Sequence, residues 1–166
     1  AGSVDSLRAL LVAPGNFERV AYLTRDVARA LLRDVSPPLQ RLVLARRCHG
    51  QAAASREQDP DMPAFFASFS GALAVEGIAR CISGQAPRPM QPVLDAEVLR
   101  RPLTRDHRGA PVIDLHGFTS AFIRDTFRSK SLRCRQCRWD AACPGEQLNY
   151  LRAHGYRTLR PVVPEA

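Results

Sequence analysis

Residues 134–145 read Cys134-Arg-Gln-Cys137-Arg-Trp-Asp-Ala-Ala-Cys143-Pro-Gly145 and hold three of the five cysteines in the chain. Two thiolates separated by two residues can bind one metal centre from a single turn. A third thiolate, Cys143, follows six residues after Cys137 and can join the same site. The three cysteines therefore predict a metal or cluster centre that organises this part of the chain.

The fourth ligand of such a centre must come from elsewhere, because tetrahedral zinc and cubane iron–sulfur clusters usually take four protein ligands. The sequence contains no second C-x2-C pair. The candidates are Cys81, Cys48, or a histidine such as His116 or His154, and we favour Cys81 over Cys48. His49, beside a glycine like His116, could also be a ligand or a general base. An odd number of cysteines, without a secretion signal, indicates free thiols or metal ligands rather than a disulfide framework.

The positive charge of the chain is concentrated around these cysteines. The formal net charge is +8, and Lys130 is the single lysine among 24 cationic residues. Residues 124–160 carry nine cations and three acids, so they hold most of the excess. Arginines can offset the negative charge of a thiolate-ligated centre, and they can also pair with the carboxylates of an acidic peptide.

Length and composition exclude several classes of protein. The 166 residues are 45% hydrophobic, which is enough for one domain or two small ones and does not fit a disordered chain. No apolar run approaches the roughly 20 residues of a membrane span. We therefore expect a cytoplasmic protein without a membrane partner.

The pattern along the chain predicts an α+β fold that is mainly α-helical. Helical spacing covers 17–33, with Asn16 as the cap, and 64–83, with Gly84 at the end. Residues 42–44 fit either a helix or a buried strand. The remaining predictions are a polar loop at 51–63, a proline-rich connector at 85–92, a short helix after Asp95, a strand at 112–115, and helices at 118–126 and 148–154.

These elements divide the chain into four parts. Residues 1–50 form a first segment, residues 51–63 a loop, and residues 64–123 a helical segment that contains the proline-rich connector. Residues 124–166 form a small cysteine-rich metal-binding module.

The module follows the pattern Cys134-x2-Cys137-x5-Cys143-Pro-Gly145-x4-Tyr150-x3-His154-Gly155, with a late Pro161. It resembles the tail of radical S-adenosylmethionine peptide maturases, which carry an auxiliary iron–sulfur module named SPASM or, in its shorter form, twitch. A second likeness lies at the start, where Ser3-Val4-Asp5-Ser6 and Gly15-Asn-Phe17 look like a mid-barrel strand and the following helix of such enzymes. The resemblance implies an incomplete α/β barrel before the module and a [4Fe-4S] cluster on Cys134, Cys137, Cys143 and Cys81.

Two departures from that family limit the function that the resemblance implies. No C-x3-C-x2-C motif is present to hold the S-adenosylmethionine-binding cluster, and Gln147 stands where a full SPASM module often has a further cysteine. The chain alone is therefore not a complete radical enzyme. We expect an iron–sulfur-binding component of a peptide-modifying system, acting with a catalytic partner protein or a missing N-terminal half on a peptide substrate.

Two other classes of function remain open. A zinc-stapled, basic nucleic-acid-binding module would use Trp139, Tyr150 and Tyr156 as stacking platforms for bases. A structural partner subunit would use the metal only to order the tail, and would pack the apolar faces at 17–31 and 64–83 against a catalytic chain.

Overall fold

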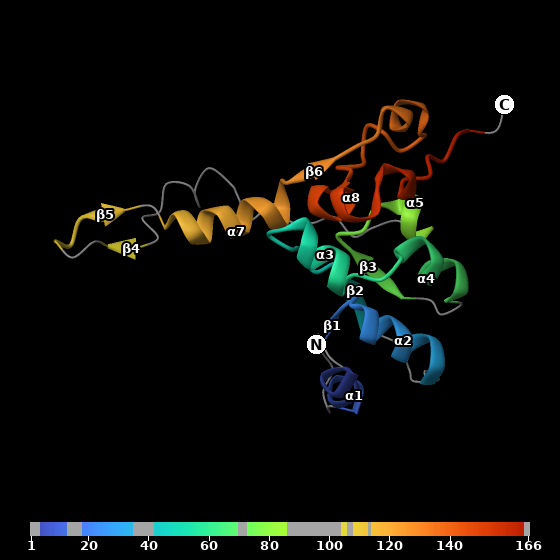
Figure 1. Ribbon diagram of the computed structural model, residues 1–166, viewed down its shortest axis with the longest axis horizontal. Helices are drawn as coiled ribbons and strands as arrows, with labels where there is room; N and C mark the ends of the chain where they lie inside the picture. Colours follow the sequence, from blue (N-terminus) through green and yellow to red (C-terminus); the bar gives the residue numbers. More distant parts are fainter. Residues whose placement is uncertain are drawn as a thin grey trace.

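The computed structural model describes residues 4–12, 18–34, 42–69, 73–85, 104–105, 108–112 and 114–164. Over these residues the chain is a mixed α+β protein with small sheets, which confirms the α+β part of the expected fold class (Figure 1). No barrel forms within the described residues.

The helices are α1 (Val4–Val12), α2 (Arg25–Asp34), α3 (Ala52–Gln58), α4 (Met62–Ser68), α5 (Arg80–Ser83), α7 (Leu115–Asp125) and α8 (Leu148–His154), with 3-10 turns η1 (Leu132–Gln136) and η2 (Tyr156–Thr158). The strands are β1 (Arg19–Tyr22), β2 (Leu42–Ala45), β3 (Ala74–Glu76), β4 (Thr104–Arg105), β5 (Pro111–Val112), β6 (Arg128–Ser129) and β7 (Glu146–Gln147).

The central sheet contains three parallel strands in the order β1-β2-β3. Val20 lies opposite Val43, and Leu44 lies opposite Val75. Parallel neighbours need a crossover connection, and the segments containing α2 and then α3 and α4 are these connections. All four residues of β2 are buried, as expected for the middle strand of a covered sheet.

One hydrophobic core joins this sheet to the C-terminal module. Leu44 of β2 and Phe65 of α4 belong to the same buried cluster as Tyr150, Leu151 and Leu159. Helix α8 packs against α3, which connects the module to the crossover between β2 and β3. The cysteine-rich segment therefore shares its core with the sheet.

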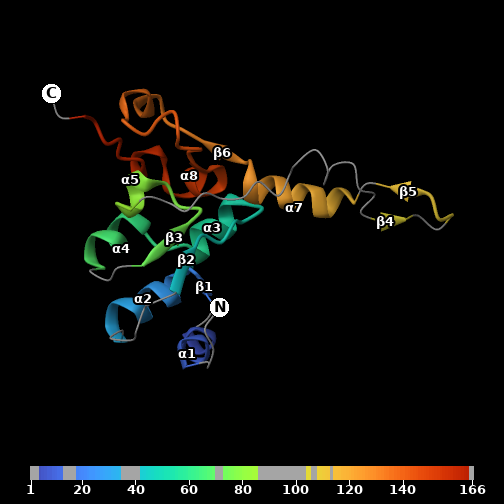
Figure 2. The same ribbon diagram turned by 180° about the vertical axis from the view of Figure 1, so that it is seen from behind.

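Helix α7 and the β4–β5 hairpin extend away from this core in both views (Figures 1 and 2). Strand β6, which follows α7, returns the chain to the core by pairing antiparallel with β7. No described helix combines the length and the apolar character needed to cross a membrane.

The structure corrects the predictions for the first 33 residues. Residues 19–22 form strand β1 instead of the first turns of a helix, and helix α2 begins only at Arg25. The β-branched Val20 and the aromatic Tyr22 favour a strand, and pairing with β2 outweighs the short helical spacing. The strand suggested for residues 3–6 is wrong where the structure describes it, because residues 4–6 belong to helix α1, and residues 15–17 lie outside the described residues. Asn16 lies outside the described residues.

The expected helix over 64–83 is also interrupted. Helix α4 ends at Ser68, strand β3 covers 74–76, and the single turn α5 follows. Leu73, Val75 and Ile78 are all buried, and a short apolar run of this kind looks alike in a buried helix and a buried strand. Gly84 does end α5 as expected, with a left-handed backbone of φ 71°.

The polar loop predicted at 51–63 contains helix α3 and the start of α4. The alanines and Arg-Glu-Gln of α3 favour helix, and the buried Ser55 donates a 2.6 Å hydrogen bond to Asp59 at its end. The polar composition of the segment concealed this helix, of which only Ser55 is buried.

The other predicted elements agree with the structure in part. Residues 42–45 adopt the strand alternative, and α8 ends before Gly155. The side chain of Asp114 caps α7 by accepting a 2.9 Å hydrogen bond from the N–H of Gly117. Of the strand predicted at 112–115, Val112 belongs to β5, and Leu115 begins α7. The connector at 86–92 and the helix expected after Asp95 lie outside the described residues.

Candidate metal centre

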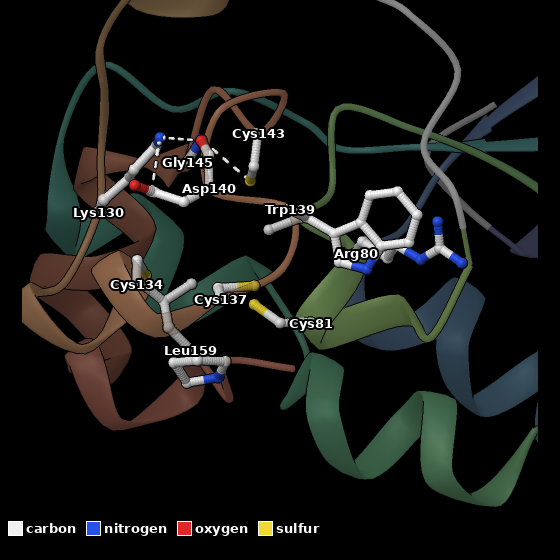
Figure 3. A pocket seen from close by; sticks show the side chains of 12 residues that line it. Arg80, Cys81, Lys130, Cys134, Cys137, Trp139, Asp140, Cys143, Gly145 and Leu159 are labelled. Carbon is white, nitrogen blue, oxygen red and sulfur yellow. Dashed lines mark hydrogen bonds and ion pairs between the residues drawn. The ribbon is translucent and has the colours of Figure 1, made fainter. Parts of the chain in front are cut away.

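Four of the five cysteines line one pocket between the module and helix α5. Cys134, Cys137 and Cys143 come from the cysteine-rich loop, and Cys81 comes from α5 (Figure 3). The remaining lining residues are Ala79, Arg80, Lys130, Trp139, Asp140, Gly145, Leu159 and Pro161. In the folded chain, Cys81, the favoured fourth ligand, therefore lines the same pocket as the three cysteines that are close together in the sequence.

A series of tight turns places the three clustered cysteines. Ser131 caps η1 by accepting a 3.1 Å hydrogen bond from the N–H of Arg133. The N–H of Cys137 donates to the carbonyl of Cys134 at 2.9 Å, which closes the C-x2-C turn. The N–H of Cys143 donates to the carbonyl of Trp139 at 2.9 Å. Local backbone bonding thus folds this loop around the pocket.

An ion pair closes the open side of the loop. Lys130 Nζ lies 2.9 Å from Asp140 Oδ1 and also donates to the carbonyl of Asp140. Both side chains are about one-third exposed, so solvent weakens the attraction between them. The pair joins the residue after β6 to the middle of the cysteine-rich loop and leaves one cation beside the thiols.

Gly145 lets the loop pass close to strand β6. Its φ of 86° lies in the left-handed region, and a Cβ at this position would lie 2.4 Å from the carbonyl oxygen of Ser129. Its N–H lies 3.4 Å from Cys143 Sγ, within range of an N–H···S hydrogen bond. Glycine is therefore required here for both the backbone conformation and the close approach.

The thiol of Cys81 lies in a different environment from that of a surface cysteine. Burial raises its pKa to about 11, a hydrogen bond from the backbone of Arg160 opposes the shift, and nearby Cys143, Cys134 and Glu146 add to it. Cys81 and Cys134 also pack against the hydrophobic core. The metal-free protein keeps Cys81 protonated at neutral pH, and a bound cation would displace that proton.

Trp139 lines the pocket beneath two arginines. The guanidinium carbon of Arg80 lies 3.9 Å from the ring centroid, and that of Arg138 lies 4.7 Å from it. Both distances fit cation–π contacts. The ring that we considered as a stacking platform for nucleic-acid bases is thus occupied by arginines of the same chain.

Tyr150, a second proposed platform, is fully buried. Burial raises the pKa of its phenol, and its hydroxyl accepts a 3.4 Å hydrogen bond from the N–H of Met62. It cannot stack on a base in this fold. Tyr156, at 40% exposure, keeps an accessible ring.

The remaining candidate ligands lie apart from the pocket lining. His49 is buried with its Nε2 3.1 Å from Asp59 Oδ1, and His154 stacks on Tyr150 with ring centroids 4.4 Å apart. His116 is exposed on α7, and Cys48 is half-buried after β2. These four residues are absent from the described lining.

Zinc and a four-iron cluster require different spacings between their thiolate ligands. A tetrahedral zinc ion binds sulfur at about 2.3 Å and so draws its ligands within roughly 4 Å of one another. Among the described residues, no three His, Cys, Asp or Glu side chains form such a compact group. A four-iron cluster takes one thiolate at each of four separate irons, and four cysteines line this pocket.

Sequence reasoning missed three charged residues beside the pocket. Arg46 and Glu146 form a buried ion pair at 2.9 Å, and Arg128 contacts the carbonyls of Gly77 and Gly145. No local motif marks these residues, because their partners lie far away along the chain.

Comparison of the chain with protein-family models, curated proteins and solved structures finds no match.

Proposed function

We propose that this chain is an iron–sulfur protein in which Cys134, Cys137, Cys143 and Cys81 hold a [4Fe-4S] cluster. One observation carries the proposal: four of the five cysteines line the same pocket, and the fourth comes from a distant helix. The chemistry that the cluster would supply is the transfer of single electrons. Trp139, Leu159 and Pro161 would limit the access of water to the thiols.

The cluster would serve a radical S-adenosylmethionine-type system that modifies a peptide. The C-terminal likeness to a SPASM or twitch module supports this assignment. The sequential, parallel order β1-β2-β3 supports it as well, because consecutive units of an α/β barrel are arranged in this way. With no C-x3-C-x2-C motif, the catalytic cluster would belong to a partner protein or to sequence outside this chain.

An acidic peptide or an acidic face of the partner protein would bind the arginines around the module. The N–H of Arg138 donates to the carbonyl of Val162, and Arg133 donates to the carbonyls of Tyr156 and Leu159. These bonds bring two arginine-bearing segments side by side. Their exposed arginines are Arg133, Arg135, Arg138, Arg157 and Arg160. A cytoplasmic location belongs to the same proposal, since reduced thiols persist in a reducing compartment.

Metal and sulfide analysis of anaerobically prepared protein tests the proposal. We expect about four irons and four sulfides per chain, with broad visible absorption from iron–thiolate charge transfer. Cys81→Ala, Cys134→Ala, Cys137→Ala and Cys143→Ala should each lower the iron content. Cys48→Ala is the matched control and should leave it unchanged, because Cys48 lies outside the pocket lining.

Two outcomes would contradict the proposal. One zinc per chain without sulfide would favour a zinc-stapled module, whose binding to nucleic acid could then be measured. A protein without metal that copurifies with a catalytic partner would favour the structural subunit.

A further inference from the structure

Cys81 reaches the pocket from a helix of one turn, far along the chain from the other three cysteines. We propose that Arg128 and Glu146 form a two-point clamp that positions Cys81 as the fourth ligand of the cluster. The inference rests on the proposed function. It adds two positioning residues that hold the backbone on both sides of the pocket.

Glu146 is the first point of the clamp. It follows Cys143 by three residues, and its Oε2 accepts a 3.0 Å hydrogen bond from the N–H of Ala79, two residues before Cys81. Ala79 is the N-cap of α5, so this bond fixes where the turn that carries Cys81 begins. The carboxylate thus links the two sides of the pocket directly.

The carboxylate of Glu146 is itself rigidly held. It is fully buried, and its Oε1 accepts a 2.7 Å hydrogen bond from the N–H of Gln147. Arg46 Nε lies 2.9 Å from the same oxygen in an ionic contact, and the Arg46 guanidinium lies over the Tyr150 ring at 4.3 Å. A buried carboxylate with these partners has little freedom to move.

Arg128 is the second point of the clamp. Its Nη1 lies 3.3 Å from the carbonyl oxygen of Gly77 and 3.3 Å from that of Gly145, and it donates to both. Gly77 precedes Cys81 by four residues, and Gly145 follows Cys143 by two. The two points therefore join the same pair of segments, 77–79 and 145–146, through opposite charges.

The role of Arg128 in the clamp can be separated from the general stability of the fold, whereas Glu146 is also the buried ionic partner of Arg46. Pairing of β6 with β7 and the core residues Tyr150, Leu151 and Leu159 hold the module in place, and Ile78 and Ala79 belong to the same core. A single turn such as α5 has little intrinsic stability, so its position depends on contacts at its ends. Loss of the clamp should consequently shift Cys81 and leave the other three thiols in place.

The test uses Arg128→Met and Glu146→Gln in anaerobically prepared full-length protein. After oxidation with ferricyanide, which accepts the one electron released per cluster, each variant should lose about one iron of the roughly four in a cubane and give the electron paramagnetic resonance signal of an oxidised [3Fe-4S] cluster, as Cys81→Ser should. Adding Arg128→Met to Cys81→Ser should cause no further loss of iron. A role in stability alone would instead make the two losses add.

Arg133→Met is the matched control. Its Nη2 lies 3.4 Å from the carbonyl oxygens of Tyr156 and Leu159, so it also bridges two backbone carbonyls but contacts neither clamped segment. This variant should keep the iron content of the wild type. Thermal unfolding of each variant shows whether it is folded, and Arg128→Met remains decisive if Glu146→Gln fails to fold.

A second measurement does not depend on the cluster. In metal-free protein, mass spectrometry should find faster alkylation of Cys81 in Arg128→Met than in the wild type, with no change in Arg133→Met. Retention of four irons in a folded Arg128→Met protein, or additive loss with Cys81→Ser, would overturn the clamp. Wild-type protein without iron would overturn the proposed function, and alkylation would still decide whether the clamp holds Cys81.

Discussion

At the level of single residues, two features of the pocket stand out. The pKa of the Cys81 thiol is raised, and Gly145 occupies a position where no other residue fits without strain. Burial raises this pKa, and a Cβ at Gly145 would clash with the carbonyl oxygen of Ser129. Each feature leads to a measurable consequence in the metal-free protein.

The stability of the metal-free protein should fall in alkaline solution because of Cys81. Its pKa is about 11 in the folded protein against an ordinary value of 9.0, so the unfolded chain loses the proton first. The contribution of the protonated Cys81 thiol to the free energy of unfolding is complete below pH 9 and disappears as the pH rises towards 11. Melting curves of the wild type and Cys81→Ala should diverge in this window.

Cys81→Ala should lose less stability than the wild type between pH 9 and 11, and equal slopes would contradict the assigned burial of this thiol. Tyr150, whose pKa burial also raises, is common to both proteins and cancels in the comparison.

Gly145→Ala should destabilise the protein by about 1–3 kcal/mol, because alanine must adopt a left-handed backbone there. The new Cβ would also lie 2.4 Å from the Ser129 carbonyl oxygen, which would push β6 away from the loop. Urea unfolding measures the difference. Gly50→Ala is the control, since a Cβ at Gly50 meets no atom within 4 Å, and comparable losses in both variants would refute the steric argument.

Among elements, the buried pair Arg46–Glu146 joins the end of β2 to β7. Its side chains are 1% and 0% exposed, so removal of one partner leaves the other as an unpaired buried charge. Arg46 Nη2 also lies 2.9 Å from Met62 Sδ. The pair therefore connects three elements of the core, β2, β7 and α4.

Arg46→Met should cost about 3–5 kcal/mol of unfolding free energy, and the double change Arg46→Met with Glu146→Leu should recover much of the loss. The exposed pair Arg29–Asp26, with side chains 65% and 67% exposed, is the control. Arg29→Ala should change stability by no more than about 1 kcal/mol. Equal losses at both sites would show that burial does not control the energy of the pair.

At the scale of the whole molecule, the sheet and the cysteine-rich module share one hydrophobic core. Leu44 in the sheet and Leu151 in α8 are both almost completely buried in it. We therefore expect the described parts of the chain that contribute to this core to unfold together.

Leu44→Ala and Leu151→Ala should each lower the stability of one common transition by about 2–5 kcal/mol. Tyrosine and tryptophan fluorescence, recorded with far-ultraviolet circular dichroism, should report the same midpoint in each variant. The exposed Val163→Ala should have little effect. Two separate transitions, one affected by each core substitution, would show that the module folds independently.

Local sequence was a reliable guide where a feature depends on close neighbours. The end of α5 at Gly84 and the turns around Cys134 and Cys137 each involve partners within a few residues. The predictions failed where pairing decides between structures of similar local pattern. Residues 19–22 and 74–76 became strands because β2 lies between them, which no short window of sequence contains.

The candidate site divides in the same way. The sequence by itself determined that three thiols lie in one turn-rich loop with many arginines, because their spacing keeps them together in any compact conformation of that loop. Only the tertiary structure decided that Cys81, and not Cys48 or a histidine, faces them. That choice depends on contacts such as Glu146 to Ala79 and Arg128 to Gly77, which form only when the sheet and the module pack into one core.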